Sequence, residues 1–217
     1  VTASRIPEGE TPDSRAIDRA VRNHLAEGLS VYDVNVEQIR ALRPDLIVTQ
    51  DQCEACAVPR SELRDRLAEF PDGGAELFNY APSTLKDVFD RALALGRRAG
   101  RLRAAMDRIG RGERRLADLR RRIGLRKDGS LASGSRPQVA CIEWFDPLMI
   151  AGHWMPDVVE QAGGRPLIVE EAGERSIEVD WTRFRESDPD VLLLMPCGFD
   201  REAARANLSY CRDRDGW

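Results

Sequence analysis

The hydrophobic positions of this chain follow two patterns, and together they predict alternating strands and helices at both ends of the sequence. Residues 46–48 and 191–194 are continuous apolar runs, the pattern of buried parallel strands covered by helices on both faces. Apolar residues three and four positions apart, preceded by Ser, Asp or Asn caps, indicate helices. The predicted strands are residues 46–49, 77–80, 139–144 and 191–194, and the predicted helices are residues 14–25, 36–42, 61–70, 83–95, 156–162 and 181–186.

The middle of the chain carries a different pattern. An apolar stripe along residues 101–123 predicts one helix about 35 Å long at 1.5 Å per residue, with Gly110 and Gly112 as positions where it could bend. A helix of this length between two sheets acts as a strut. The predicted fold class is therefore α/β, with two lobes of mainly parallel sheet joined by a long backbone helix. We expect an N-terminal lobe at residues 1–100, the backbone helix at 101–124 and a C-terminal lobe at 125–217.

One segment of the sequence occurs twice. The matched positions are Val34 and Val179, Asn35 and Asp180, Ile39 and Phe184, Pro44 and Pro189, and Asp45 and Asp190, and the members of each pair are 145 positions apart. Each copy has the pattern of a short helix, a Pro-Asp turn and a strand that ends in a polar loop with a cysteine, Cys53 in the first copy and Cys197 in the second. The repeat predicts two similar lobes whose cysteine-bearing loops lie near a shared cleft.

Composition narrows the class of protein. With 217 residues, 42% hydrophobic and 32% charged, the chain is a globular protein of one large or two small domains. Its net charge of −4 argues against a nucleic-acid partner. Residues 97–126 hold twelve arginines and three acidic residues, but no aromatic residues are interleaved, which favours a solvated strut over a nucleic-acid-binding face.

No apolar run approaches the roughly 20 residues of a membrane span. No signal peptide is visible at Val1, and because the chain also lacks an initiator Met, this says little about its compartment.

The five cysteines are too few for a disulfide scaffold in a chain of this length. Cys141 lies in a predicted strand and is expected in the core, whereas Cys211 lies in a polar tail and carries little signal. Cys53 and Cys56 have the spacing of a redox or metal-binding pair. No second Cys-x-x-Cys completes a zinc site, and Val58-Pro59 separates the pair from the next predicted helix, so packing or ligand contact is the favoured interpretation.

A second loop region gathers aromatic side chains after the strand at 139–144. Trp144 and Trp154 can form a flat wall with polar tips, which suits a large amphipathic ligand. Phe145 fits a core position equally well. His153 is one of only two histidines, so no multi-histidine metal site exists, and hydrogen bonding is favoured over metal ligation. The sequence shows no Gly-rich phosphate loop, no Ser-His-Asp order and no convincing pair of catalytic carboxylates, which argues against an enzyme.

Several motifs together resemble one known family. They are Tyr32-Asp33-Val34-Asn35, the run from Leu42 to Val58, Glu143-Trp144 with Asp146-Pro147-Leu148-Met149, Gly152-His153-Trp154, Ala162-Gly163-Gly164 and the run from Met195 to Asp200. These motifs resemble the cobalamin-binding branch of the substrate-binding proteins of ABC importers. The resemblance implies two α/β lobes joined by a backbone helix, an extracytoplasmic location, and capture of a corrinoid in the cleft for a membrane permease. It implies no catalysis and no cofactor.

The resemblance also assigns roles to single residues. Tyr32, Trp144 and Trp154 would supply apolar walls, and Gln50, Asp51 and His153 would hydrogen-bond the amide-rich rim of the corrinoid. The further expected ligand-binding residues are Cys53, Cys56, Phe145, Cys197 and Phe199. Family members dock on the permease through an acidic residue on each lobe, which Glu37 matches by position and Glu202 by a weaker correspondence.

Two alternatives stay open. Within the same class, the ligand could be an iron–siderophore or haem; in another class, the chain could be an intracellular thiol or metal enzyme that uses Cys53, Cys56 and Cys197.

The chain also departs from the family, whose members extend several dozen residues before Val1 and well beyond Trp217. We therefore expect open sheet edges and exposed apolar surface near Val1 and after Asp200. Some relatives also carry an aromatic residue near Gln50.

Overall fold

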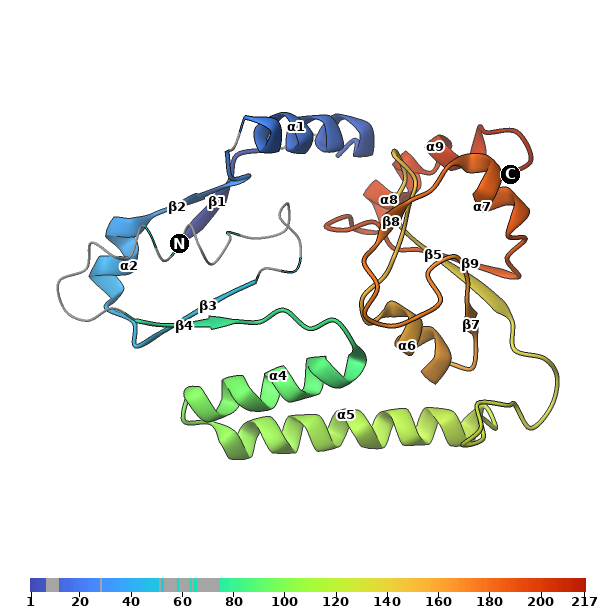
Figure 1. Ribbon diagram of the computed structural model, residues 1–217, viewed down its shortest axis with the longest axis horizontal. Helices are drawn as coiled ribbons and strands as arrows, with labels where there is room; N and C mark the ends of the chain where they lie inside the picture. Colours follow the sequence, from blue (N-terminus) through green and yellow to red (C-terminus); the bar gives the residue numbers. More distant parts are fainter. Residues whose placement is uncertain are drawn as a thin grey trace.

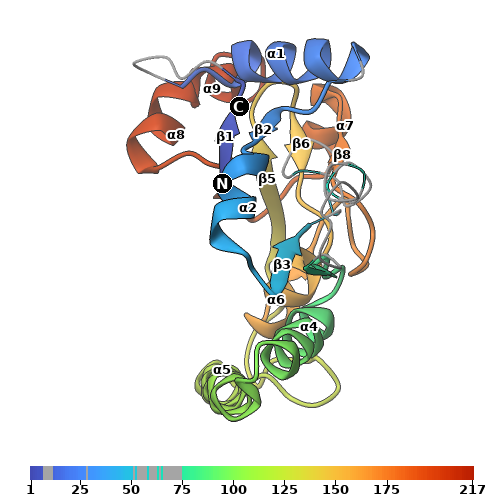
Figure 2. The same ribbon diagram turned by 90° about the vertical axis from the view of Figure 1, so that its left-hand side faces the viewer.

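The computed structural model describes residues 1–6, 12–27, 29–50, 52, 58, 63, 65 and 75–217. The chain forms two α/β lobes that are linked along one side by helices α4 (Leu85–Arg98) and α5 (Leu102–Arg122). Figure 2 shows these two helices below both lobes. The α/β fold with two lobes and a backbone helix is thus confirmed.

The N-terminal lobe contains two small sheets. β1 (Thr2–Ser4) pairs antiparallel with β2 (Tyr32–Val34), and β3 (Leu46–Thr49) pairs parallel with β4 (Glu76–Asn79). Helices α1 (Ser14–Ala26) and α2 (Val36–Leu42) belong to the same stretch of chain. Its small core consists of Val34, Ile39, Val58 and Leu63. Most of the predicted helix at 61–70 lies outside the described residues.

The C-terminal lobe is built on one five-stranded sheet around β5 (Gln138–Trp144). Two strands, β7 (Arg165–Pro166) and β9 (Val191–Leu194), run parallel to β5, whereas β6 (Met149–Ile150) pairs antiparallel with both β5 and β8 (Ile177–Glu178). The helices are α6 (Met155–Gln161), α7 (Trp181–Glu186), α8 (Arg201–Asn207) and α9 (Ser209–Arg212). The sheet is therefore mixed. The sequence did not predict β6 and β8, because strands of two residues are too short to leave a periodic pattern.

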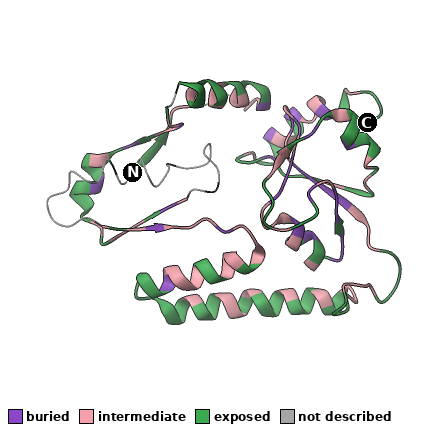
Figure 3. Cartoon of the chain, viewed as in Figure 1, coloured by how far each residue is buried: buried purple, intermediate pink, exposed green. Residues whose placement is uncertain are grey.

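The largest core of the described residues lies in this C-terminal lobe, where Figure 3 also shows many of the buried segments. Its fully or nearly fully buried members are Ala140, Ile142, Phe145, Leu148, Ile150, Val169 and Cys211. Cys211 carried little signal in the sequence analysis, but it is 0% exposed in the structure. After Asp200, Ala203, Asn207 and Cys211 are buried whereas Trp217 is 45% exposed, so coverage there is mixed and the expected truncation stays a prediction.

The sequence repeat is a structural repeat. α2 and α7 begin 145 positions apart, and so do β3 and β9, each of which follows its helix and pairs parallel with another strand. Asn35 and Asp180 cap the two helices through their side-chain oxygens. Ile39 and Phe184, the matched apolar residues of the two helices, are each 4% exposed.

The turn after each helix also repeats. Arg43 and Asp188 have φ values of 43° and 44°, and each precedes the proline of its copy. A non-glycine residue rarely adopts this left-handed conformation, so its occurrence at matched positions shows that both turns have the same geometry.

α5 is one continuous helix of 21 residues, about 31 Å long, and it passes through Gly110 and Gly112 without interruption. It has no buried residue, and α4 packs alongside it. Gly96 permits the close approach of the two helices, since a Cβ at this position would lie 2.4 Å from the Cβ of Ala105. Across the described part of the chain, helices lack the combination of length and apolar composition that a bilayer crossing requires.

β9 is less covered than its sequence predicts. Val191, Leu193 and Leu194 are 39%, 42% and 38% exposed, so the prediction of a second buried strand is wrong. β9 pairs only with β5 among the described strands, so it lies at an edge of the sheet. In β3, Val48 is likewise 48% exposed, and β1 is exposed throughout, as expected near Val1.

The two buried thiols make stability depend on pH. Burial raises the pKa of Cys141 and of Cys211 to about 11, from an ordinary value of 9.0. The unfolded chain releases these protons near pH 9, whereas the folded chain retains them until about pH 11. Their stabilising contribution is therefore complete below pH 9 and is lost as the pH rises toward 11.

We expect the free energy of unfolding, measured with denaturant, to fall between pH 9 and pH 11, and to fall less steeply in a Cys211→Ala variant.

In a Cys53→Ser/Cys56→Ser background at pH 8, a thiol reagent should modify the exposed Cys197 in the native protein and reach Cys141 and Cys211 only after denaturation. Equal reaction rates for all three thiols would contradict this prediction.

Candidate ligand-binding site

The carboxyl end of β5 places two neighbouring aromatic residues in different environments. Trp144 is half-buried, and its ring lies 5.2 Å from the ring of Phe199, at an angle of 59°. Its indole N–H donates a hydrogen bond of 3.2 Å to the carbonyl oxygen of Ser14. Phe145 is 0% exposed and packs in the core, the alternative that the sequence had left open.

A pocket lies at the carboxyl end of β9, next to this aromatic pair. Its volume is about 270 Å³, and its lining residues include Leu194, Met195, Pro196, Phe199, Ala204 and Leu208, together with Asp200, Arg201 and Arg205. The carboxyl ends of parallel strands are where open α/β sheets bind ligands. Phe199 belongs to both the pocket and the aromatic pair, so the two features form one continuous surface.

A backbone contact fixes the loop that carries His153. The His153 N–H donates to the Glu174 carbonyl oxygen at 2.6 Å, and the His153 carbonyl oxygen accepts from the Gly173 N–H at 2.9 Å. The Gly152 N–H donates to the Ser176 hydroxyl oxygen at 3.1 Å. A Cβ at Gly152 would lie 2.5 Å from the Glu174 carbonyl oxygen, so only glycine permits this approach.

The side chains on this loop are held in a defined orientation. His153 has a φ of 55°, in the left-handed region. Its ring centroid is 6.2 Å from that of Trp154, the residue that precedes α6. Strained backbone at a non-glycine residue often accompanies function, which makes this loop a second candidate binding element, separate from the residues that line the pocket.

Burial changes the ionisation of two side chains at the site. It lowers the pKa of His153, with a smaller contribution from the Arg175 guanidinium. Burial raises the pKa of Glu143, partly opposed by a hydrogen bond from Ser176. His153 is therefore a neutral imidazole at pH 7, which can accept a hydrogen bond or bind a metal centre.

The N-terminal lobe contributes fewer described site residues. Tyr32 packs against the core of its own lobe. The Gln50 side-chain amide N–H donates to the Gln52 side-chain oxygen at 3.2 Å, and Gln52 donates in turn to the Pro82 carbonyl oxygen at 2.7 Å, which ties the end of β3 to the segment before α4. Asp51, Cys53 and Cys56 lie outside the described residues.

Cys197 is exposed, and its backbone N–H donates to the Glu143 carbonyl oxygen at 3.1 Å. Because Cys53 lies outside the described residues, the predicted approach of the two cysteine-bearing loops stays a prediction. Among the residues that the structure describes, no group of three His, Cys, Asp or Glu side chains is arranged to hold a metal ion.

The two expected docking residues lie on different lobes. Glu37 is exposed in the first turn of α2 and forms an ion pair with Arg40 at 2.7 Å. Glu202 is exposed in the first turn of α8.

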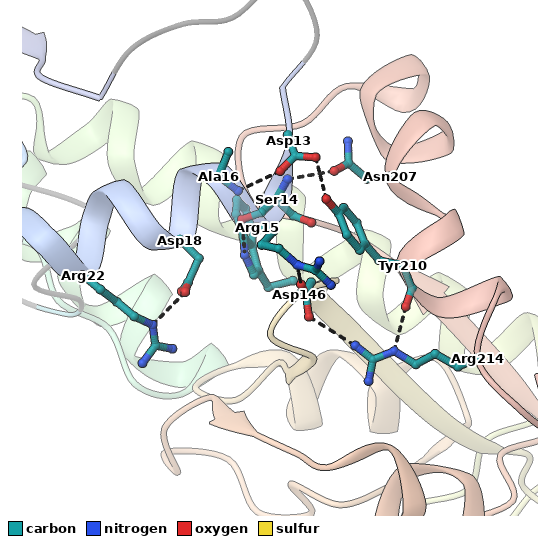
Figure 4. Close-up of polar contacts among 11 residues, drawn as sticks. Asp13, Ser14, Arg15, Ala16, Asp18, Arg22, Asp146, Asn207, Tyr210 and Arg214 are labelled. Atoms are coloured by element: carbon teal, nitrogen blue, oxygen red, sulfur yellow. Dashed lines mark hydrogen bonds and ion pairs between the residues drawn. The ribbon is translucent and has the colours of Figure 1, made fainter.

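Sequence reasoning missed the contribution of α1 to this region. The helix carries the residues of Figure 4 that contact the C-terminal lobe, including Asp13 at its N-cap, Ser14 and Arg15. Arg15 forms an ion pair with Asp146, in the loop directly after β5. The sequence signal was only the helix cap at Asp13, which marks where the helix begins but not what it contacts.

Comparison with known proteins supports the interpretation of this fold. A model of the periplasmic binding protein family matches residues 9–209. A search of the curated proteins finds no match to the chain. Among solved structures, an ABC transporter substrate-binding protein from Listeria monocytogenes EGD-e is similar, with a TM-score of 0.65 and 16% sequence identity over 84% of this chain and 65% of that one.

Two further solved structures are similar. A periplasmic haem binding protein from Pseudomonas aeruginosa has a TM-score of 0.61 and 20% identity, over 82% of this chain and 60% of that one. A periplasmic vitamin B12 binding protein of Vibrio cholerae has a TM-score of 0.52 and 21% identity, over 74% of this chain and 57% of that one. The chain thus spans less than two thirds of the length of these structures.

Proposed function

The chain belongs to the periplasmic binding protein family, and from that premise we propose that it captures a corrinoid outside the cytoplasm and presents it to the permease of an ABC importer. The family consists of binding proteins, which agrees with the expectation of a non-enzymatic protein and does not support the alternative of a thiol or metal enzyme. In this proposal residues 101–124 form the backbone helix between lobes at 1–100 and 125–217.

One observation carries the proposal: the Trp144–Phe199 pair continues into an apolar pocket at the ends of β5 and β9. A corrinoid has a broad apolar ring and an amide-rich rim. Burying about 100 Å² of apolar surface against the aromatic wall contributes roughly 2.5 kcal/mol. The neutral imidazole of His153 and the carboxyl group of Glu143 supply polar partners for the rim.

Haem is a second candidate ligand, and the specific observation is His153, in the loop before α6. A neutral imidazole held in a strained loop beside an aromatic ring is suited to coordinate the iron of a haem. Haem and a corrinoid thus make different demands on this residue, because haem would be coordinated through its iron, whereas the corrinoid rim would only exchange a hydrogen bond with the imidazole.

Absorption spectroscopy and calorimetry with cyanocobalamin, haemin and ferrioxamine B distinguish these ligands. We expect saturable binding of cyanocobalamin with a stoichiometry of one and no product formation. A shifted haem absorption band that disappears in a His153→Ala variant would instead identify haem as the ligand. Absence of binding to all three compounds would overturn the proposed function.

We expect Trp154→Ala to weaken binding of the same ligand by about tenfold, since each 1.4 kcal/mol of lost contact is a factor of ten. Trp217→Ala is the matched control, because Trp217 stacks on Trp181 at 6.1 Å and lies in the C-terminal tail. Equal affinities of the two variants would show that Trp154 does not contact the ligand.

The docking roles of Glu37 and Glu202 predict a different pattern. Replacing either residue with alanine should leave ligand affinity unchanged and weaken association with the permease.

A further inference from the structure

Helix α1 connects the two lobes at a point far from the backbone helices. The strands on either side of it in the sequence, β1 and β2, pair with each other in the N-terminal lobe. The beginning of α1 nevertheless lies against α8 and α9 of the C-terminal lobe (Figures 1 and 4). Ser14, its first residue, is the only buried residue that the helix has.

Asn207 forms two side-chain hydrogen bonds with the start of this helix and the residue before its cap, and a third within its own helix α8. Its side-chain oxygen accepts from the Ser14 backbone N–H at 2.8 Å, and its amide nitrogen donates to the carbonyl oxygens of Pro12 at 2.7 Å and Ala203 at 2.9 Å. The first backbone N–H groups of a helix have no partner within the helix. Asn207 of α8, which is only 3% exposed, supplies a hydrogen-bond acceptor for one of these groups in α1.

Tyr210 and Asp146 add a second set of contacts. The Tyr210 hydroxyl donates to the Asp13 carboxylate at 2.6 Å, while the Arg15 guanidinium lies 4.9 Å from the centre of the Tyr210 ring. Asp146 accepts from Arg15 and, at 3.2 Å, from Arg214. The hydrogen bond from Tyr210 is the main reason that the pKa of Asp13 is lowered, so Asp13 stays ionised at neutral pH.

These contacts end at the candidate site. The Ser14 carbonyl oxygen accepts the indole N–H of Trp144, which fixes one edge of a ring whose other neighbour is Phe199. We propose that Asn207 and Tyr210 are positioning residues for ligand capture: they clasp the first turn of α1, and the clasped Ser14 carbonyl sets the orientation of Trp144 beside the β9 pocket. The ligand-binding half of this inference rests on the proposed function.

The clasp, meaning the contacts of Asn207 and Tyr210 with residues 12–14, acts through the backbone of Ser14 and not through its side chain. Among the described residues the buried Ser14 hydroxyl has no hydrogen-bond partner. Ser14→Ala should therefore leave the clasp intact, which makes it an internal control. Tyr80→Phe is the matched control for Tyr210→Phe, because the Tyr80 hydroxyl also donates a single hydrogen bond, to the Val88 carbonyl oxygen at 3.0 Å, away from α1.

The test measures the environment of Trp144 directly, by fluorine NMR of the full chain. With 5-fluorotryptophan incorporated, the four tryptophans give four fluorine resonances, and a Trp144→Phe variant assigns the relevant one. We expect the Trp144 resonance to shift or broaden in Tyr210→Phe and in Asn207→Ala and to stay in place in Ser14→Ala and Tyr80→Phe. An unchanged Trp144 resonance in both clasp variants would overturn the proposal, whatever ligand the protein binds.

The second measurement is the affinity for cyanocobalamin or haemin, whichever binds the unmodified protein. Loss of one hydrogen bond in Tyr210→Phe should weaken binding by about three- to tenfold, and both controls should stay within about twofold. A shifted Trp144 resonance with unchanged affinity would refute the ligand-positioning role. If the unmodified protein binds neither compound, capture of a corrinoid or haem is excluded, and the effect of Asn207 and Tyr210 on Trp144 is tested by the fluorine resonance alone. Tyr210→Phe keeps the ring, so the test does not depend on whether Asn207→Ala folds.

Discussion

Replacing Gly152 with alanine should lower the free energy of unfolding by about 3 kcal/mol, the upper part of the range for overpacking a filled site. The added Cβ would lie 2.5 Å from both the Arg175 carbonyl carbon and the Glu174 carbonyl oxygen, and 2.6 Å from the Ser176 nitrogen. All three are backbone atoms, so the clash cannot be relieved by rotating a side chain. The loop from Gly173 to Ser176 has to separate from the His153 loop, with loss of the hydrogen bonds between them.

Gly110→Ala is the matched control for this change. Gly110 lies within α5, and the closest atom to an added Cβ is a guanidinium nitrogen of Arg114 at 3.3 Å, the far end of a flexible side chain. Alanine in a helix interior should stabilise the protein by about 0.5–1 kcal/mol relative to glycine. Denaturant unfolding of the two variants should therefore give changes of opposite sign, and equal stabilities would show that the Gly152 contact is not tight in solution.

Phe145→Ala should destabilise the protein by about 3 to 5 kcal/mol, as expected for an aromatic side chain that fills a core. Phe145 is 0% exposed and packs in the C-terminal core. The cost combines the lost transfer free energy of the ring with the cavity that it leaves. Thermal and denaturant unfolding measure this effect directly.

Trp144→Ala, the neighbouring change, should have the opposite profile. Trp144 is only half-buried and contacts Phe199 and the Ser14 carbonyl oxygen, so its removal should weaken ligand binding more than it lowers stability. The comparison separates a core aromatic residue from a site aromatic residue one position away. If Phe145→Ala were stable but unable to bind ligand, Phe145 would belong to the site as the sequence resemblance implied.

The local elements of this fold are determined by short stretches of sequence. The bounds of α2, β3, α7 and β9 are those expected from the repeated motif, with Asn35 and Asp180 as caps. Each cap supplies a side-chain oxygen to a backbone N–H three residues later, and each proline disfavours helical backbone in the residue before it. Such effects act within one or two turns, so a single sequence is enough to locate them.

The candidate site was predictable only in part. The aromatic and polar residues after β5 and β9 were recognised because they directly follow apolar strands, and structure places Trp144 and Phe199 in contact. The pocket residue Leu208 and the residues that hold α1, Asn207 and Tyr210, had no local signal, because their partners lie elsewhere in the sequence.

The repeat, the helix caps, the buried Cys141 strand and the long α5 helix were thus all predictable, because each depends on residues that are neighbours in the chain. The two-residue strands β6 and β8, the burial of Cys211, the exposure of β9 and the attachment of α1 to the C-terminal lobe were visible only in the folded molecule. These features depend on pairings between distant positions, such as Ser14 with Asn207 across 193 residues and Ser14 with Trp144 across 130. The hydrophobic pattern of a segment specifies that it needs a partner surface but not which surface it meets.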